Sequence, residues 1–171
     1  MRAFFQIILV AMGLLASLPA AMRSNIDEHQ FLDNLRQEMA PVVFSGPLSL
    51  ANLNLNLSGS VVAAQPGEQL FGMLNFEYDK TTLDPDTLNQ IVIGFEEMGA
   101  QKCIFNEPSY RCAEGITSFF LNVPSEPGLY EVQCRFEQAN NPIEAISSWD
   151  TSEVMVIGKV LVREHRGMCD D

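Results

Sequence analysis

The sequence has few of the residues on which most catalytic sites depend. Its 171 residues include two histidines, four cysteines and one tryptophan. There is no G-x-S-x-G, no H-E-x-x-H and no glycine-rich phosphate loop. A serine triad needs a histidine base within hydrogen-bond reach of its nucleophile, yet His29 and His165 lie near opposite ends of the chain. We interpret both as solvated surface residues and predict a protein that is not an enzyme and needs no cofactor.

Basic residues are also scarce. Ten lysines and arginines stand against 22 aspartates and glutamates, which gives a formal net charge of −12. A chain of this charge repels phosphate backbones and anionic lipid, so nucleic acid and membrane surfaces are not expected partners. The charge is interpreted as a solubility feature of an exported protein, with a cationic partner or calcium as the alternative.

Only the start of the chain has a long apolar run. Met1-Arg2 precede the apolar run from Phe4 to Leu15, and small residues follow at 16–21. The run is shorter than the roughly 20 residues of a membrane-spanning helix, and its flanks are typical of a secretory signal peptide. We interpret residues 1–22 as a signal peptide and predict a secreted or periplasmic protein with no stable membrane anchor after cleavage. A retained single-span anchor is the alternative.

The cysteines are interpreted in the light of this predicted export. No cysteine precedes Cys103, and an even number of cysteines in an exported chain is most simply explained by two disulfides. Cys103 and Cys112 flank eight residues rich in turn formers. Among three possible pairings we favour Cys103–Cys112, which leaves Cys134 to pair with Cys169. The absence of C-x-x-C spacing argues against a zinc site.

The segment after the signal peptide, residues 23–41, is expected to contain one short amphipathic helix, from about 24 to 40. Its apolar residues fall on one helical face, and Pro41 ends the run. These residues are Phe31, Leu32, Leu35 and Met39. This apolar stripe either packs on the core of the protein or serves as a docking face.

Residues 42–171 are predicted to form a β-sandwich domain with a C-terminal tail. Leu48 and Leu50 share one phase of strand alternation and Leu53 and Leu55 the other, which predicts a β-bulge near Ala51-Asn52. Further alternating segments follow at 70–78, 90–95, 102–105, 116–123, 129–136 and 153–162. Seven or eight short strands with turns at intervals of roughly 8–12 residues indicate a mainly β, antiparallel sandwich.

One stretch carries a family resemblance. Pro127-Gly128-Leu129-Tyr130-Glu131-Val132 resembles the tyrosine-corner stretch of immunoglobulin-like and fibronectin type III-like domains. The resemblance implies an immunoglobulin-like β-sandwich in which the Tyr130 hydroxyl bonds to upstream backbone. The chain departs from the antibody type, because Cys134 follows Tyr130 by four residues instead of two.

Several residues are candidate contacts. Asp79, Asp84 and Asp86 occupy one loop and are weak calcium candidates, but their spacing lacks the EF-hand glycine and terminal glutamate. We therefore predict no metal site. Tyr110 and Trp149 are possible partner contacts, because loop aromatics at a sandwich edge can fill a partner's pocket or stack on sugars. A packed Trp149 is the alternative.

Phe119 and Phe120 are adjacent, so one of them faces outward from a strand. The outward ring is expected to add to a surface patch.

These observations predict an exported, non-enzymatic module that binds another protein through loops 106–111 and 138–150 on a rigid β-framework. An inhibitor of a secreted enzyme, acting through the loop from Cys103 to Cys112, is one alternative. A calcium-binding or carbohydrate-binding module is another, and a small hydrolase is the most distant.

Overall fold

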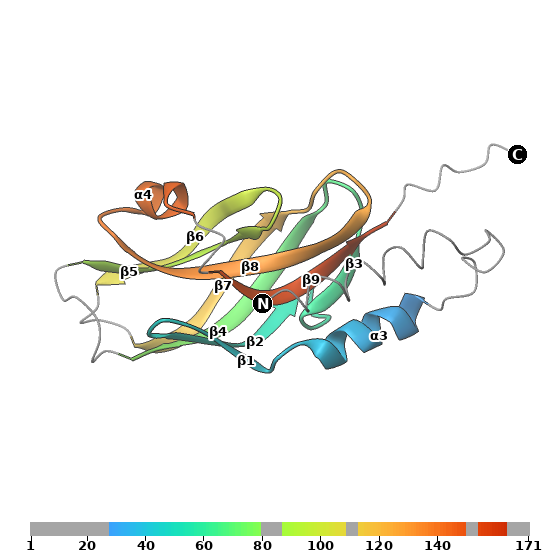
Figure 1. Ribbon diagram of the computed structural model, residues 1–171, viewed down its shortest axis with the longest axis horizontal. Coiled ribbons are helices and arrows are strands. Elements are labelled where there is room, and N and C mark those ends of the chain that lie inside the picture. Colours follow the sequence, from blue (N-terminus) through green and yellow to red (C-terminus); the bar gives the residue numbers. More distant parts are fainter. Residues whose placement is uncertain (1–27, 80–86, 109–112, 150–153, 164–171) are drawn as a thin grey trace, which may run out of the picture.

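The computed structural model describes residues 28–79, 87–108, 113–149 and 154–163, which form two β-sheets packed face to face, together with two helices (Figure 1). The chain is mainly β and mostly antiparallel, as the sequence predicts. The predicted signal peptide lies outside the described residues. Within them, no helix has both the length and the apolar character needed to cross a bilayer.

The elements follow one another in a simple order. They are α3 (Glu28–Glu38), β1 (Val42–Ser45), β2 (Leu48–Leu55), β3 (Val61–Ala64), β4 (Gln69–Tyr78), β5 (Leu88–Phe95), β6 (Gly99–Pro108), β7 (Glu114–Asn122), β8 (Gly128–Ala139), α4 (Pro142–Ser147) and β9 (Met155–Val162).

Two sheets make up the sandwich. The four-stranded sheet has the order β1-β2-β4-β7, and the five-stranded sheet has the order β3-β9-β8-β5-β6. One pair corrects the expectation of a wholly antiparallel sandwich, because β3 runs parallel to β9, with Val61 opposite Lys159. The sequence analysis missed β3, since a run of four residues is too short to show strand alternation.

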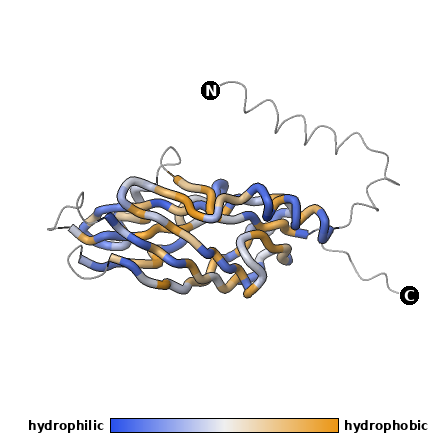
Figure 2. The backbone as a smooth tube through the Cα atoms, turned by 90° about the horizontal axis from the view of Figure 1, so that it is seen from below, coloured by the Kyte–Doolittle hydropathy of each residue, from blue (hydrophilic) through white to orange (hydrophobic). Residues whose placement is uncertain are grey.

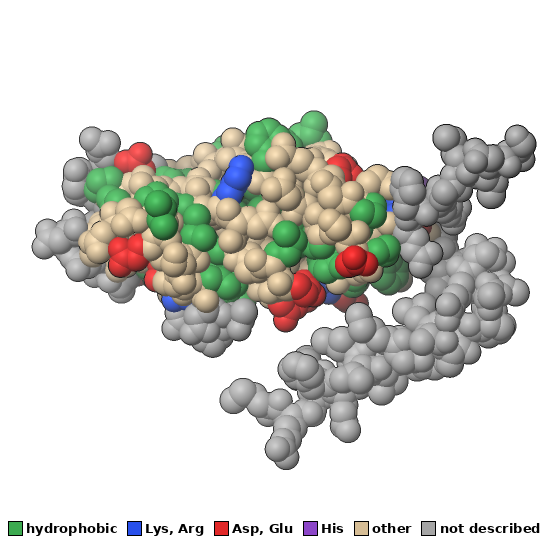
Figure 3. All heavy atoms as spheres, turned by 90° about the horizontal axis from the view of Figure 1, so that it is seen from above, with side chains coloured by type: hydrophobic (Ala, Val, Ile, Leu, Met, Phe, Trp, Pro, Cys, Tyr) green, Lys and Arg blue, Asp and Glu red, His purple; other side chains and the backbone are tan. Residues whose placement is uncertain are grey.

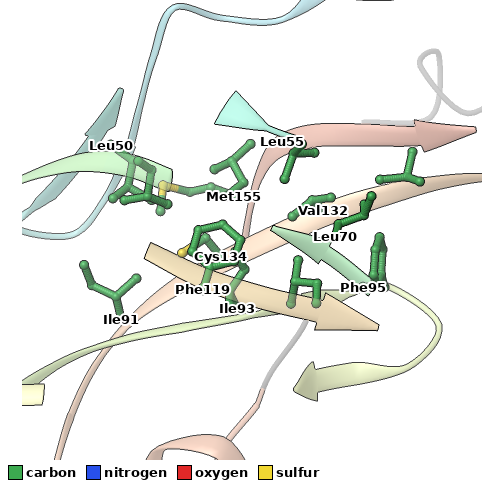
Figure 4. Packing of buried hydrophobic residues seen from close by; sticks show 14 of the residues in the cluster. Leu50, Leu55, Leu70, Ile91, Ile93, Phe95, Phe119, Val132, Cys134 and Met155 are labelled. Atoms are coloured by element: carbon green, nitrogen blue, oxygen red, sulfur yellow. The ribbon is translucent and has the colours of Figure 1, made fainter. Parts of the chain in front are cut away.

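The core lies between the inner faces of the two sheets (Figure 4). Leu48, Leu50 and Leu55 are all buried although they do not share one phase of the sequence. The β2–β4 register shifts between Ala51 and Asn54, and Asn52 has a φ of 55°. This confirms the predicted bulge, which rotates the second half of β2 so that its leucines still face the core.

Helix α3 packs its apolar stripe onto the five-stranded sheet. Leu32 and Leu35 are buried against Val61, with Phe31 and Met39 beside them. The apolar stripe of α3 therefore packs on the sheet, which is the first of the two uses considered from the sequence. Ion pairs anchor both ends of the helix, from Arg163 to Glu28 and from Lys159 to Glu38 at 3.6 Å.

Helix α4 covers part of the outer face of the five-stranded sheet, in a region expected to be a loop with at most one helical turn. The Asn141 side chain caps it by accepting a 3.0 Å hydrogen bond from the Glu144 amide, and Pro142 occupies its first turn. Ala145 is buried against Val92 and Ala139, and the half-buried Trp149 packs on the same cluster. The structure thus places Trp149 in a packed position instead of presenting it at a loop tip.

Candidate functional site

The outer face of the four-stranded sheet carries large apolar side chains. An antiparallel sheet with one face on the core normally presents polar residues on the other. Here Phe44 and Ile116 are each 71% exposed, Val42 is 42% exposed and Phe120 is 46% exposed. Together with the half-buried Phe71 and Met73, these four residues form what we call the apolar face: Val42, Phe44, Phe71, Met73, Ile116 and Phe120.

Strand register brings these residues together from distant parts of the chain. Val42 pairs with Ala51, Ala51 with Asn75, and Asn75 with Ile116, so one row crosses all four strands. Two rows further along, Phe71 pairs with Phe120, and their ring centroids lie 5.4 Å apart. Because paired residues on one face are close neighbours, the apolar face is a continuous surface.

The face is hollowed toward one end. A depression of about 530 Å³ lies between Val42 and Ile116, with Ala51 and Asn75 in its lining. Glu77 and Glu114, a register pair on β4 and β7, also line it. An open depression of this kind accommodates the side chains of a second surface more readily than it encloses a small ligand.

Charge is confined to the two ends of the apolar face. Glu77 and Glu114 lie at one end, in the row that also holds Phe44 and Ser49. At the other end, the Lys102 ammonium lies 5.9 Å from the centroid of the Phe120 ring, within cation–π range. Between these ends, the described outward residues of β4 and β7 are uncharged.

The wider surface has little basic character. On the side seen in Figure 3, green hydrophobic side chains lie among uncharged polar atoms, and few blue basic side chains are visible. Figure 2 shows the opposite side, where hydropathy alternates along the strands and helix α3 is mostly hydrophilic.

A second, smaller hollow of about 260 Å³ lies beside the C-terminal end of α3. Arg36, Asn52 and Ser60 are the polar members of its lining. The Arg36 guanidinium donates to Asp33 at 2.6 Å and to the Val61 carbonyl at 3.0 Å. Because its positive charge is already paired with Asp33, Arg36 offers no uncompensated charge for a ligand.

The weak calcium candidates are only partly described. Asp84 and Asp86 lie outside the described residues, as do Tyr110 and His165. Asp79 is exposed, and its backbone amide donates to the Pro47 carbonyl at 2.8 Å. Among the described residues, no three side chains of His, Cys, Asp or Glu form a group that could hold a metal ion.

No disulfide joins the two described cysteines, Cys103 and Cys134. Cys103 is half-buried and its thiol donates to the Phe105 carbonyl at 3.0 Å, while Cys134 is fully buried in the core (Figure 4). Cys112 and Cys169 lie outside the described residues, so Cys103–Cys112 stays a prediction. Cys134–Cys169 likewise stays a prediction; within β8, Cys134 lies opposite Met155 of β9.

A pH prediction follows from the position of Cys134. Burial raises the pKa of the Cys134 thiol above its ordinary value of 9.0. Above pH 9 the unfolded chain therefore loses this proton while the folded chain keeps it, so the free energy of unfolding should fall as pH rises, by about 1 kcal/mol per pH unit. Urea unfolding at pH 8, 9.5 and 10.5 measures this slope.

Cys134→Ala is the matched control, because it retains every other titrating group. The free energy of unfolding of this variant should fall less steeply with pH than that of the wild type, by about 1 kcal/mol per pH unit. An equal slope in the two proteins would show that Cys134 does not titrate, as a disulfide at this position would require.

Tyr130 makes a hydrogen bond to backbone. Its hydroxyl donates to the Glu126 carbonyl at 2.9 Å, four residues upstream. Its ring meets Phe95 edge to face, with centroids 6.4 Å apart. Tyr130 thus fixes the turn that precedes β8 against the core, which is the contact that the sequence resemblance implies.

Comparison of the chain with protein-family models and with curated proteins finds no match.

The sequence analysis noticed one component of the apolar face. Phe119 is buried, at 5% exposure, and the neighbouring Phe120 points outward, as expected for one of the two rings. The rest of the face was missed, since it depends on which strands become neighbours. Alternation placed Ile116 within an expected strand, but nothing local to the sequence relates it to Val42.

Proposed function

We propose that the protein is an exported binding module with an immunoglobulin-like β-sandwich, and that it contacts another protein through the apolar face. The main observation in support is that Phe44 and Ile116 are exposed on one side of a sheet whose other side already forms the core. The contact surface proposed from the structure is thus a sheet face instead of the loops at 106–111 and 138–150.

Strand order supports the immunoglobulin-like assignment. Domains of that class place strands A, B and E in one sheet and strands G, F, C and C′ in the other. The order β2-β4-β7 corresponds to A-B-E, and β9-β8-β5-β6 corresponds to G-F-C-C′. Tyr130 then lies at the start of strand F with its hydroxyl on upstream backbone, as in a tyrosine corner.

The shape and chemistry of the surface support a protein partner. Small-molecule sites are concave and bury most of their ligand, whereas the apolar face is a broad surface with a shallow hollow toward one end. Aromatic and aliphatic side chains surrounded by polar groups are the composition of protein interfaces. Trp149 is packed on Ala145 and Val92, which removes the strongest sequence argument for carbohydrate stacking.

Site-specific crosslinking tests this function. A photoreactive phenylalanine analogue replaces Ile116, and the exported protein is irradiated in the cells or medium that contain it. We expect discrete covalent adducts, because the reactive ring would lie within the contact. Mass spectrometry of the adducts identifies the partner.

The control places the same probe at Ile143, which is 77% exposed on α4 and so equally accessible. This position lies on the other sheet's side and should give no discrete adduct. Equal labelling from both positions, or no adduct from position 116, would overturn the proposed function.

A further inference from the structure

We infer that the apolar face binds a second copy of the same chain, so that two molecules pair through their four-stranded sheets. This inference rests on the binding function proposed above and names its partner.

The face has charges of opposite sign at its two ends. Glu77 and Glu114 form a cross-strand pair at the end near Phe44. Lys102 lies at the other end, over the Phe120 ring at the β7 edge. The rows between them hold Met73 and Ile116 and no charge on β4 or β7. The face therefore has an apolar centre, an acidic end and, at the β7 side of its other end, a single lysine that reaches it from β6 of the other sheet.

Two symmetric ways of stacking such a face on itself are possible. Both have a two-fold axis in the plane between the sheets. An axis along the strands would bring Glu77 against Glu77 of the second copy, and each lysine end against the other. An axis across the strands keeps β7 over β7 but reverses its direction, so that the acidic end of each copy meets Lys102 of the other.

The arrangement with its axis across the strands allows apolar contact and attraction between opposite charges at the same time. It stacks the apolar rows around Ile116 and Val42 on one another, at the roughly 10 Å spacing of packed sheets. It also brings the acidic end of each copy against Lys102 of the other, so this attraction forms twice, once at each end of the interface. Like charges held together across an interface are costly, whereas complementary ends fix its register.

The area of the face indicates how strongly two copies should bind each other. The face is roughly 20 Å long from Phe71 to Glu77 and, in the rows where β1 contributes Val42 and Phe44, roughly 14 Å wide from β1 to β7. Two such faces, with their side chains, bury about 1,000 Å² in total, which is at the lower limit of specific interfaces. We therefore expect a reversible dimer with a Kd on the order of 10 µM.

The net charge of −12 does not prevent this pairing. Only Glu77 and Glu114 are acidic among the described outward residues of β4 and β7. The Debye length is about 8 Å at physiological ionic strength, so acidic groups beyond the face are largely screened from the second copy.

Sedimentation equilibrium of the purified mature protein tests the inference. Wild type should show a monomer–dimer equilibrium between about 1 and 100 µM. Ile116→Ser should weaken it at least about tenfold, because it removes the largest exposed side chain of the central row. Ile143→Ser, an equally exposed apolar residue on α4, should leave it unchanged.

Charge exchange tests the orientation. Two charge changes are needed: Lys102→Glu at one end, and Glu77→Lys together with Glu114→Lys at the acidic end. Each change alone should weaken the dimer, by about five- to tenfold, since it places like charges together. The double charge variant, which carries both changes, restores opposite charges at both ends and should recover wild-type affinity within about threefold. Circular dichroism checks that each variant is folded.

Each outcome has a defined meaning. A protein that is monomeric at 100 µM overturns the second-copy inference, and the crosslinking result from position 116 then shows whether the face binds a different protein. A dimer that Ile116→Ser leaves intact overturns the use of this face. A dimer that the double charge variant fails to restore, while each change alone weakens it, overturns the orientation.

Discussion

Gly94→Ala is expected to lower the free energy of unfolding by more than about 4 kcal/mol, a size seen only for a short list of structural mechanisms. A Cβ at position 94 would lie 1.9 Å from the Gly99 carbonyl oxygen and 2.8 Å from its carbon. Both atoms belong to the backbone of the β5–β6 hairpin, so no side-chain rotation can relieve the overlap. Urea unfolding measures the loss, and failure to reach the folded state would be its limiting case.

Gly115→Ala provides the matched comparison. A Cβ there would meet the Phe76 ring at 3.0 Å, and a ring can shift where backbone cannot. Its cost should be about 1–2 kcal/mol, in the usual range for an overpacked site. If Gly94→Ala costs no more than Gly115→Ala, β5 and β6 do not approach as closely as described.

Phe95→Ala is expected to cost about 3–5 kcal/mol, because it leaves a ring-sized cavity in the core. Phe95 has no exposed surface and lies within the core (Figure 4). Its ring meets Tyr130 edge to face. Chemical unfolding at low protein concentration measures the change in free energy without a contribution from association.

Phe44→Ala removes the same atoms from the apolar face, where the ring is 71% exposed. Its cost should stay within about 0.5 kcal/mol, as for other surface substitutions. Comparable losses in the two variants would mean that Phe44 belongs to the core of the folded chain and not to a surface available for binding.

Local patterns predicted much of the fold. The change of phase between Leu50 and Leu53 predicted the bulge in β2, since only a register shift buries leucines of both phases. The stripe of Leu32 and Leu35 predicted a helix, although residues before Glu28 lie outside the described structure. Each of these features is encoded within about ten neighbouring residues.

The elements that were predicted least well depend on distant contacts. Helix α4 has six residues, too few to show helical periodicity, and is held by Asn141 and by packing on β5, β6 and β8. β3 is defined by its pairing with β9. The strands on which α4 packs and the strand that pairs with β3 cannot be recognised from the local sequence.

The candidate site shows the same limit. Val92 and Ile116 both point away from the core on their strands, yet Val92 is buried beneath α4 whereas Ile116 is bare. Alternation predicts which way a side chain points. Whether anything covers it depends on the three-dimensional arrangement, and so the apolar face becomes visible only once the strands are placed.

The parallel pairing of β3 with β9 has a consequence for the order of assembly. It joins residues 61–64 to residues 159–162, so this edge of the five-stranded sheet is completed by almost the last strand synthesised. Until then, Val61 and the apolar stripe of α3 lack the strand that supports them. Contacts so distant in sequence form slowly, so this edge of the sheet should be among the last parts of the fold to form.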